Sequence, residues 1–143
     1  MILKIKNLPV KILIVGVIKK GYSILMRNKF PGAGPYIETW YSFSADFVSG
    51  KEPSIVFKEY IKDFIGIDIL PIKYLFWDTE VKKDYDGVKK QFIYLNIEFK
   101  YISGNILVPK DLKGIEWVSL KKLSSLDIVP PFVVLFKKLK YLK

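Results

Sequence analysis

Three acidic residues near the middle of the chain have the types and spacing of a site for a divalent cation. Glu59 and Asp63 are four residues apart, and Glu52 precedes them by about two helical turns. In a helix these side chains project onto one narrow stripe, because residues four apart are neighbours on the helix surface. Carboxylate oxygens suit a hard cation such as Mg²⁺. The alternative is a solvated flank of the helix, with Lys58 and Lys62 nearby.

The composition removes several other kinds of active site. The 143 residues include no cysteine and no histidine. This excludes disulfides, thiolate nucleophiles, zinc sites built from Cys and His, and catalytic triads with a histidine base. The net charge is +10 and Arg27 is the only arginine, so nearly all of the positive charge is lysine. A basic surface favours anionic partners such as nucleotides, RNA or acidic lipid.

Length and hydropathy indicate one globular domain that spans residues 1–143. Half of the residues are hydrophobic, which is enough for a packed core. The longest apolar runs, such as residues 12–18, are too short to span a bilayer, and residues 1–6 lack the features of a signal peptide. We therefore expect a cytoplasmic protein with no transmembrane segment.

The segment that begins at Gly50 keeps the frame of a known catalytic motif. Gly50 and Pro53 form its turn, and Ile61 takes a buried apolar position. The segment ends on a glycine and an apolar residue, Gly66 and Ile67. This pattern resembles the signature of the Nudix hydrolases, G-x5-E-x7-R-E-U-x-E-E-x-G-U, in which U is apolar. The resemblance implies cleavage of diphosphate-linked substrates with divalent cations held by glutamates of the motif helix.

Aligned with this signature without gaps, the chain lacks most of the acidic residues. Lys51 stands at the first glutamate, and Tyr60 and Phe64 stand where two metal-binding glutamates belong. Glu59 replaces the arginine, and only Asp63 keeps an acid at a ligand position. An aromatic ring cannot replace a carboxylate bound to Mg²⁺, so this register predicts a degenerate metal site filled by core-extending rings. A stacking platform for a base at Tyr60 is the alternative use of these rings.

A register shifted by one residue would preserve an active site. Glu59 then matches the glutamate of the Arg-Glu pair, Asp63 matches the last acid, and Glu52 supplies another carboxylate. The shift requires either a rotation of the helix by about 100° or a bulge next to Gly66. It turns part of the apolar face around Ile61 away from the core, whereas the ungapped register needs no such strain.

Other candidate ligand contacts lie outside the motif helix. Arg27 ends a strand in the hairpin that lines the substrate cleft of the family, and it could hold an anion through two hydrogen bonds or form a surface ion pair. Trp40, Tyr41 and Phe43 border the same region, where rings stack on a nucleobase or fill the core. Lys51 is either a phosphate ligand or a solvated lysine.

A late carboxylate, as found in some members of the family, is a further possibility. Asp84, Asp86 and Glu98 are the candidates for it. A charged loop and an exposed strand face explain these three residues equally well.

Hydrophobic periodicity predicts the elements that position these residues. Strands are expected at residues 11–19, 23–27, 40–48, 69–77, 91–101 and 115–119. A helix is expected from Glu52 or Pro53 to Ile65, because proline suits the first turn and Gly66 the position after the last. Residues 120–126 form a helical turn and residues 130–142 a closing helix. Polar residues 78–90 are expected to form a loop or hairpin tip, and residues 104–114 a second loop.

The ends of the chain extend the resemblance over nearly its whole length. Residues 116–123, followed by Pro130 and Pro131, resemble the last strand and final helix of a Nudix domain, and residues 24–27 resemble its N-terminal hairpin. The resemblance implies an α/β fold, a Nudix-type α/β/α sandwich around a mixed β-sheet. Many members are dimers, so a homodimer is expected by analogy.

Three functions follow from these observations. The first is a pseudoenzyme that binds a nucleotide or another anion, or acts as an interaction module, with little or no pyrophosphohydrolase activity. The second is an atypical Mg²⁺-dependent hydrolase of nucleoside-diphosphate-linked substrates that uses Glu52, Glu59 and Asp63. The third is association with RNA or a membrane through the basic closing helix, which could equally be a docking helix with a lysine-rich outer face.

Overall fold

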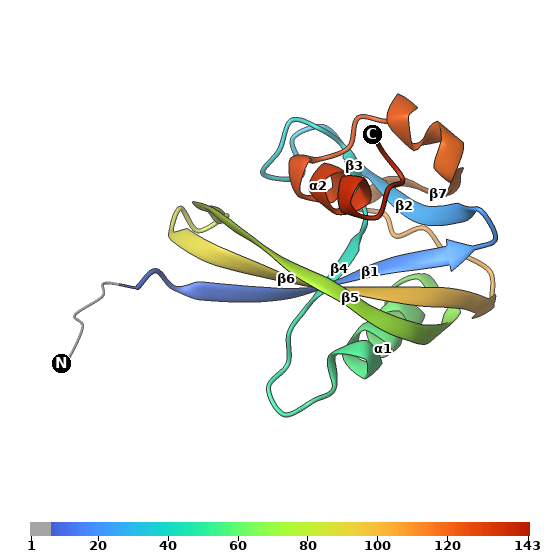
Figure 1. Ribbon diagram of the computed structural model, residues 1–143, viewed down its shortest axis with the longest axis horizontal. Coiled ribbons are helices and arrows are strands. Elements are labelled where there is room, and N and C mark those ends of the chain that lie inside the picture. The colour runs from blue at the N-terminus through green and yellow to red at the C-terminus, as the bar shows by residue number, and fades with distance from the viewer. Residues whose placement is uncertain (1–6) are drawn as a thin grey trace.

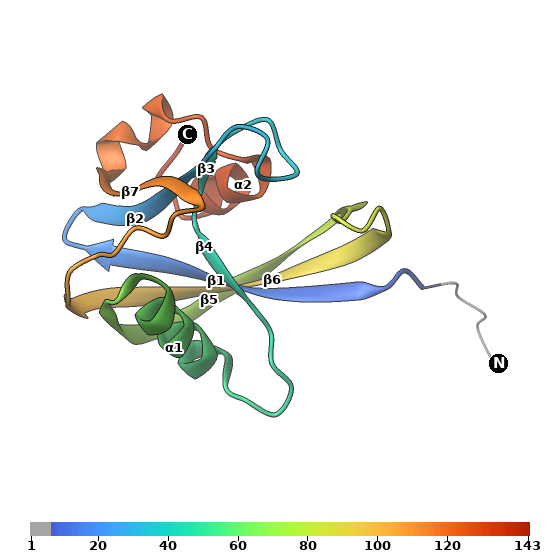
Figure 2. The same ribbon diagram turned by 180° about the vertical axis from the view of Figure 1, so that it is seen from behind.

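The computed structural model describes residues 7–143 (Figure 1). In chain order the elements are β1 (Val10–Lys20), β2 (Ser23–Lys29), β3 (Trp40–Tyr41), β4 (Phe43–Asp46), α1 (Pro53–Ile65), β5 (Asp68–Lys83), β6 (Lys89–Ser103), β7 (Leu112–Ser119), the 3₁₀ helix η1 (Leu120–Ser125) and α2 (Pro130–Lys138). The predicted α/β fold is confirmed: α1 lies below the sheet and α2 above it, in the view of Figure 1 and from behind in Figure 2.

The sheet is mixed and is organised around β1. On one side β1 pairs in parallel with β6, and β5 continues the sheet as an antiparallel partner of β6. On the other side β4 pairs with the middle of β1, and β2 pairs only with its end, at Lys19 and Lys20. β3 and β7 are both antiparallel partners of β2. The strands therefore diverge from β1, which leaves room between the β5–β6 hairpin and the loop after β2.

Local signals set the bounds of α1 as the sequence predicts. A carboxylate oxygen of Glu52 accepts a hydrogen bond from the backbone N–H of Ser54 at 3.4 Å, and Pro53 occupies the first turn. Gly66, with φ of 82°, ends the helix in the left-handed conformation that favours glycine. The packing also requires a glycine in β1, because a Cβ on Gly16 would stand 2.1 Å from the ring of Phe57.

Two hydrophobic clusters lie on opposite faces of the sheet. The cluster below the sheet contains the buried face of α1, where Phe57, Ile61 and Ile65 are 0% exposed. The cluster above the sheet contains Phe132 and Phe136 of α2 together with buried residues of β1, β2 and β6. The ungapped register of the motif predicts this burial of α1, whereas the shifted register would turn part of that face outward.

Some predicted bounds are wrong. β5 runs on to Lys83, so residues 78–83 are strand, and only the turn near Gly87 separates β5 from β6. The single strand expected at residues 40–48 is two short strands with different partners. α2 ends at Lys138 rather than at residue 142. None of the helices in residues 7–143 is long and apolar enough to cross a membrane.

Candidate functional site

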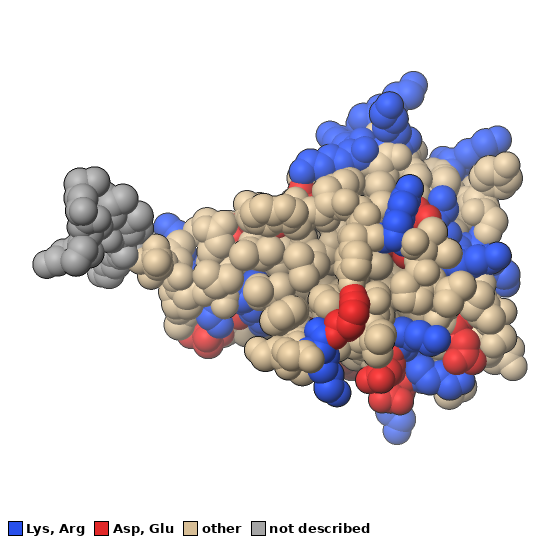
Figure 3. Space-filling view, turned by 60° about the horizontal axis from the view of Figure 1, so that its bottom comes forward, with Lys and Arg blue, Asp and Glu red and all other residues tan. Residues whose placement is uncertain are grey.

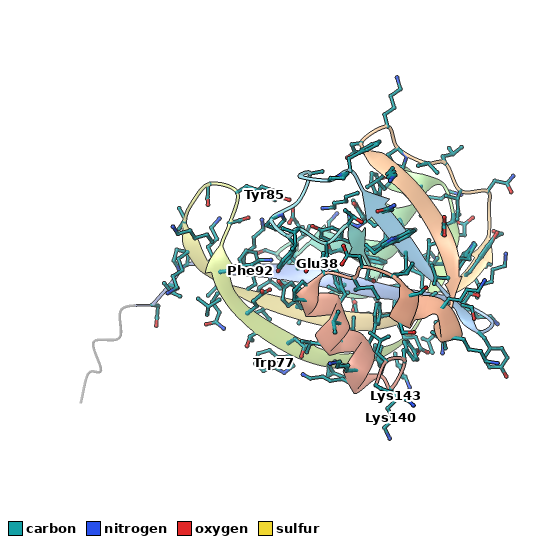
Figure 4. The ribbon with its side chains drawn as sticks, turned by 90° about the horizontal axis from the view of Figure 1, so that it is seen from above. Glu38, Trp77, Tyr85, Phe92, Lys140 and Lys143 are labelled. Carbon is teal, nitrogen blue, oxygen red and sulfur yellow. The ribbon has the colours of Figure 1, made fainter. Side chains whose placement is uncertain are left out.

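A cavity of about 240 Å³ opens beside α2, where the residue 30–39 loop faces the β5–β6 hairpin. Its basic lining residues are Lys11, Arg27, Lys29, Lys82 and Lys83. Its aromatic lining residues are Tyr36, Tyr41, Tyr85, Phe92, Tyr94 and Phe132. Figure 4 looks onto this side of the molecule, with Tyr85 and Phe92 labelled on the hairpin. We call this cavity the basic pocket.

Arg27 is a fixed, buried cation in the wall of the basic pocket. It is 8% exposed, its Nε donates to the carbonyl oxygen of Ser42 at 2.9 Å, and its Nη2 donates to Ser44 Oγ at 3.2 Å. Its guanidinium carbon lies 5.6 Å from the ring centre of Tyr41 and 5.5 Å from that of Phe43. Burial lowers the pKa of Arg27, but a guanidinium remains charged at neutral pH. The surface ion pair considered for Arg27 is wrong, since the side chain is buried and bonded to neutral oxygens.

Lys29 is the second cation at this end of the pocket. Its Nζ lies 4.1 Å from the ring centre of Tyr41. Burial, and then repulsion by Arg27, lower the pKa of Lys29 to about 8. A bound anion would favour the charged form of Lys29, so the pocket should prefer negatively charged ligands.

A cluster of polar side chains fastens the residue 30–39 loop to the sheet. Glu80 of β5 accepts hydrogen bonds from Tyr36 Oη at 3.0 Å and from Tyr94 Oη at 2.7 Å. Lys82 Nζ lies 3.6 Å from Glu80 and also covers the ring of Tyr36. Burial raises the pKa of both tyrosines, so they remain protonated donors. We call these four residues the Glu80 cluster.

The loop can approach the sheet closely because of one glycine. Gly34 lies against the hydroxyl group of Tyr41, and a Cβ built on Gly34 would stand 2.0 Å from Tyr41 Oη. Pro35 and Tyr36, which follow it in the loop, line the basic pocket.

The acid of the basic pocket is already paired. Asp84 forms ion pairs with Lys11 at 3.1 Å and with Lys90 at 2.8 Å. These contacts, with a hydrogen bond from the backbone of Tyr85, hold the pKa of Asp84 far below its usual range. Arg27, Lys29 and Lys83 form no ion pair within residues 7–143, which leaves the pocket positive.

The other predicted late carboxylates lie elsewhere. Asp86 is in the turn after β5 and pairs with Lys90 at 2.9 Å. Glu98 is on β6, in register with Lys73 of β5. Neither residue lines the basic pocket.

The residues predicted to hold a metal lie on the other side of the sheet. Figure 3 brings this underside forward and shows acidic and basic side chains interspersed on it. Glu52 caps α1 and is bonded to Ser54, while Glu59 and Asp63 are exposed on the outer face of the helix. Within residues 7–143 no three acidic side chains come together. Tyr60 and Phe64 stack with ring centres 5.3 Å apart. The side chains on this face do not fit Mg²⁺, which needs several oxygen ligands.

The predicted ligand contacts are only partly brought together. Trp40 packs against the hydrophobic cluster above the sheet, and its backbone forms hydrogen bonds with that of Asp127 and Val129. Lys51 is exposed in the turn before α1, so neither residue lines the basic pocket. Tyr60 is close enough to Arg27 for the guanidinium to favour its ionised form, although burial raises the pKa of Tyr60 on balance.

Several contributors to the pocket are absent from the sequence-based prediction. They are Lys29, Tyr36, Glu80, Lys82 and Tyr94. The alternation of Asp78, Glu80 and Lys82 with less polar residues was the available signal for two of these positions, Glu80 and Lys82, because it has the period of a strand.

Solved structures that share this arrangement of elements include Nudix and MutT proteins. The MutT protein from Methanosarcina mazei Go1 superposes with a TM-score of 0.74 at 14% identity, covering 94% of this chain and 95% of that chain. A Nudix hydrolase from Nitrosomonas europaea gives 0.70 at 13% identity, covering 91% and 86%. A UDP-X diphosphatase gives 0.58 at 12% identity, covering 85% and 55%. By sequence, the chain matches no family model and no curated protein.

The fold is therefore that of a Nudix-like domain, as the resemblance in sequence predicts. The MutT and Nudix structures share it over most of their own length.

Proposed function

We propose that this protein is a Nudix-fold module that binds an anionic, nucleotide-like ligand in the basic pocket, with little or no pyrophosphohydrolase activity. The observation that carries the proposal is the pair of partly or fully buried cations, Arg27 and Lys29, in a cavity walled by aromatic rings. The UDP-X diphosphatase fold supports a nucleotide as the ligand class, since its substrate contains one.

The two halves of a nucleotide match the two kinds of lining residue. Arg27 and Lys29 are placed to hold phosphate oxygens, and Lys83 adds a further cation at the hairpin. Tyr85, which is 71% exposed, offers a ring face to a base, whereas Phe92 is buried and forms part of the apolar wall. The cavity of about 240 Å³ is below the usual range for a drug-sized ligand, about 300–1,000 Å³, which favours a mononucleotide over a dinucleotide.

The outer face of α1 supports the absence of hydrolysis. Splitting a phosphoanhydride requires neutralisation of the charge that develops on the phosphoryl oxygens, a task that bound metal ions perform in most such enzymes. Tyr60 and Phe64 present stacked rings where carboxylates one turn apart would share a cation. Glu59 and Asp63 point to solvent instead of toward the pocket.

Calorimetric titration with AMP, UMP and ADP-ribose in metal-free buffer tests the binding. We expect saturable binding that Lys29→Met weakens at least tenfold and that Lys110→Met, an exposed lysine in the loop before β7, leaves unchanged. Equal loss in both variants, or no binding by the wild type, would refute the pocket.

Phosphate release from dinucleotides and sugar nucleotides with Mg²⁺ or Mn²⁺ tests the second half of the proposal. We expect release at the background rate. Metal-dependent turnover that falls in Glu59→Gln and Asp63→Asn would instead establish the atypical hydrolase that uses Glu52, Glu59 and Asp63.

A further inference from the structure

A second surface, which shares no lining residue with the basic pocket, has unpaired lysines around two open hollows. One hollow, about 680 Å³, runs between η1 and the C-terminal half of α2 and has Lys121, Lys137 and Lys143 in its lining. The other, about 450 Å³, adjoins it through Leu120 and Lys121 and is walled by Tyr22. Figure 4 shows Lys140 and Lys143 projecting outward at the end of this path. We call the two hollows together the lysine trough.

The charges of the trough are available to a partner. Lys121, Lys137 and Lys143 are exposed, and within residues 7–143 none of them forms an ion pair. Glu38 and Asp127 line the same hollow as these three lysines, so its lining has a small excess of positive charge. Lys137 also complements the dipole of α2, but that role does not account for Lys121 or Lys143, which lie outside the helix.

The backbone after α2 holds another lysine in a strained conformation. Lys140 has φ of 63°, a conformation that usually requires glycine. The turn is fixed by a hydrogen bond from the backbone N–H of Tyr141 to the carbonyl oxygen of Phe136 at 2.8 Å. Lys140 is exposed, so this turn presents its side chain to solvent beside the trough.

Aromatic side chains accompany these lysines. Tyr22, in the turn between β1 and β2, is 87% exposed and lines the same hollow as Lys121. Tyr141 lines the larger hollow, and Lys19 Nζ lies 5.7 Å from its ring centre. Exposed rings flanked by lysines are the pattern by which proteins stack bases while they neutralise phosphates.

We propose that the lysine trough binds single-stranded nucleic acid. Lysine rather than arginine supplies the charge, which favours backbone contacts that are indifferent to base sequence. Single strands are favoured over duplex because a ring such as that of Tyr22 can stack only on an unpaired, accessible base. A membrane surface is disfavoured because Phe132, Leu135 and Phe136 of α2 are buried in the core, so the helix has no free apolar face to insert.

The test is fluorescence anisotropy with a labelled 12-nucleotide oligouridylate at several salt concentrations. The variant replaces Lys121, Lys137 and Lys143 by Gln. At 0.1 M salt we expect roughly 100-fold weaker binding and a salt slope lower by about 2, since each lost phosphate contact contributes about 0.7 to the slope. A matched variant replaces Lys89, Lys110 and Lys113, exposed lysines outside the trough, and should bind like the wild type.

Two further comparisons separate stacking from simple charge. Tyr22→Ala should weaken binding at least about fivefold, and Tyr22→Phe should not, because base stacking needs only the ring. An abasic oligonucleotide should be insensitive to Tyr22→Ala. Melting curves of every variant verify that it is folded.

Several results would overturn the proposal. These are equal weakening by the two triple variants, equal affinity for a 12-base-pair duplex, or capture of phosphatidylserine vesicles but not of the oligonucleotide. The trough lies apart from the basic pocket, so Lys29→Met should leave oligonucleotide binding unchanged. Competition by AMP would place the strand in the pocket and refute the trough.

Discussion

The basic pocket and the outer face of α1 both carry ionisable side chains, but only the pocket fixes them. Arg27 is buried and held by Ser42 and Ser44, whereas Glu59 and Asp63 lie in solvent. A charge that is desolvated and oriented interacts strongly with a ligand, while a solvated charge is screened and loses entropy when it is ordered. The difference favours the pocket over the helix face as the site of the proposed ligand, and assigns packing to the helix face.

The largest effect on this difference is expected when carboxylates are placed on the outer face of α1. We expect Tyr60→Glu combined with Phe64→Glu to lower the free energy of unfolding by about 3 kcal/mol in EDTA, because two partly buried rings lose their packing. Urea denaturation measures this loss. Added Mg²⁺ should raise the melting temperature of the double variant and leave that of the wild type unchanged. If Mg²⁺ also raised the melting temperature of the wild type, the conclusion that this face of α1 contributes packing rather than metal binding would be contradicted.

Removing the fixed cation tests the other side of the comparison. Arg27→Met should lower the free energy of unfolding by about 2 kcal/mol, because the Ser42 carbonyl oxygen and the Ser44 hydroxyl lose a charged donor. It should also abolish anion binding. Chemical denaturation and calorimetry provide the two readouts, with Lys110→Met as the control. Arg27→Lys should fall between the wild type and Arg27→Met, since lysine keeps the charge without the paired geometry.

The titration of Lys29 tests the role of the pocket without a substitution, because pH alone changes the charge of this side chain. Its pKa is about 8 in the folded protein, compared with 10.5 for an unperturbed lysine. Anion affinity should fall by up to about tenfold per pH unit above pH 8, because the ligand favours the charged form.

The stability of the ligand-free protein should change in the opposite direction. Between about pH 8 and pH 10 the unfolded chain keeps the proton that folded Lys29 has lost, so the free energy of unfolding rises with pH. Both trends should be absent from Lys29→Met. Calorimetric titration measures the anion affinity at each pH, and urea denaturation measures the free energy of unfolding. Identical pH profiles in variant and wild type would rule out Lys29 as their source.

A smaller effect is expected when the Glu80 cluster loses its charge. Glu80→Gln removes the ion pair with Lys82 but leaves an oxygen for Tyr36 and Tyr94, so we expect a loss of about 1 kcal/mol. Faster amide exchange should appear in residues 30–39 and not in α1. Mass spectrometry of hydrogen exchange resolves the two segments, and uniform acceleration would argue against a local fastening role.

The smallest effects belong to the solvated acids. Glu59→Gln and Asp63→Asn should each change the free energy of unfolding by less than about 0.5 kcal/mol and leave ligand affinity intact. A loss of binding in either variant would remove the distinction between the two regions.

Local signals made α1 predictable, whereas β5 was only half predicted. Pro53, Gly66 and a 3.6-residue apolar period define the helix without reference to the rest of the chain. Beyond Trp77, the strand turns Asp78 and Glu80 toward α2 and the loop, where they bond to Lys138 and Tyr36. Polar residues on the inner side of a strand contradict the usual apolar pattern, so this part of β5 was predicted as a loop.

The pocket shows the same division between local and long-range information. Arg27 was a candidate because it is the only arginine and ends a strand of the first hairpin. The contacts of the Glu80 cluster could not be predicted from the sequence, since its hydrogen bonds join residues 44 and 14 positions apart on separate strands and a loop. Only the pairing of β5 with β6 and the closure of the loop bring these side chains together.

The absence of a side chain on Gly34 has a consequence for the position of the loop. A Cβ at this position would stand 2.0 Å from the hydroxyl oxygen of Tyr41, so even an alanine would force the loop or Tyr41 to move. The next two residues, Pro35 and Tyr36, line the basic pocket, so a displaced loop would change the shape of that cavity. A single missing methyl group thus sets how closely the loop approaches the opposite wall.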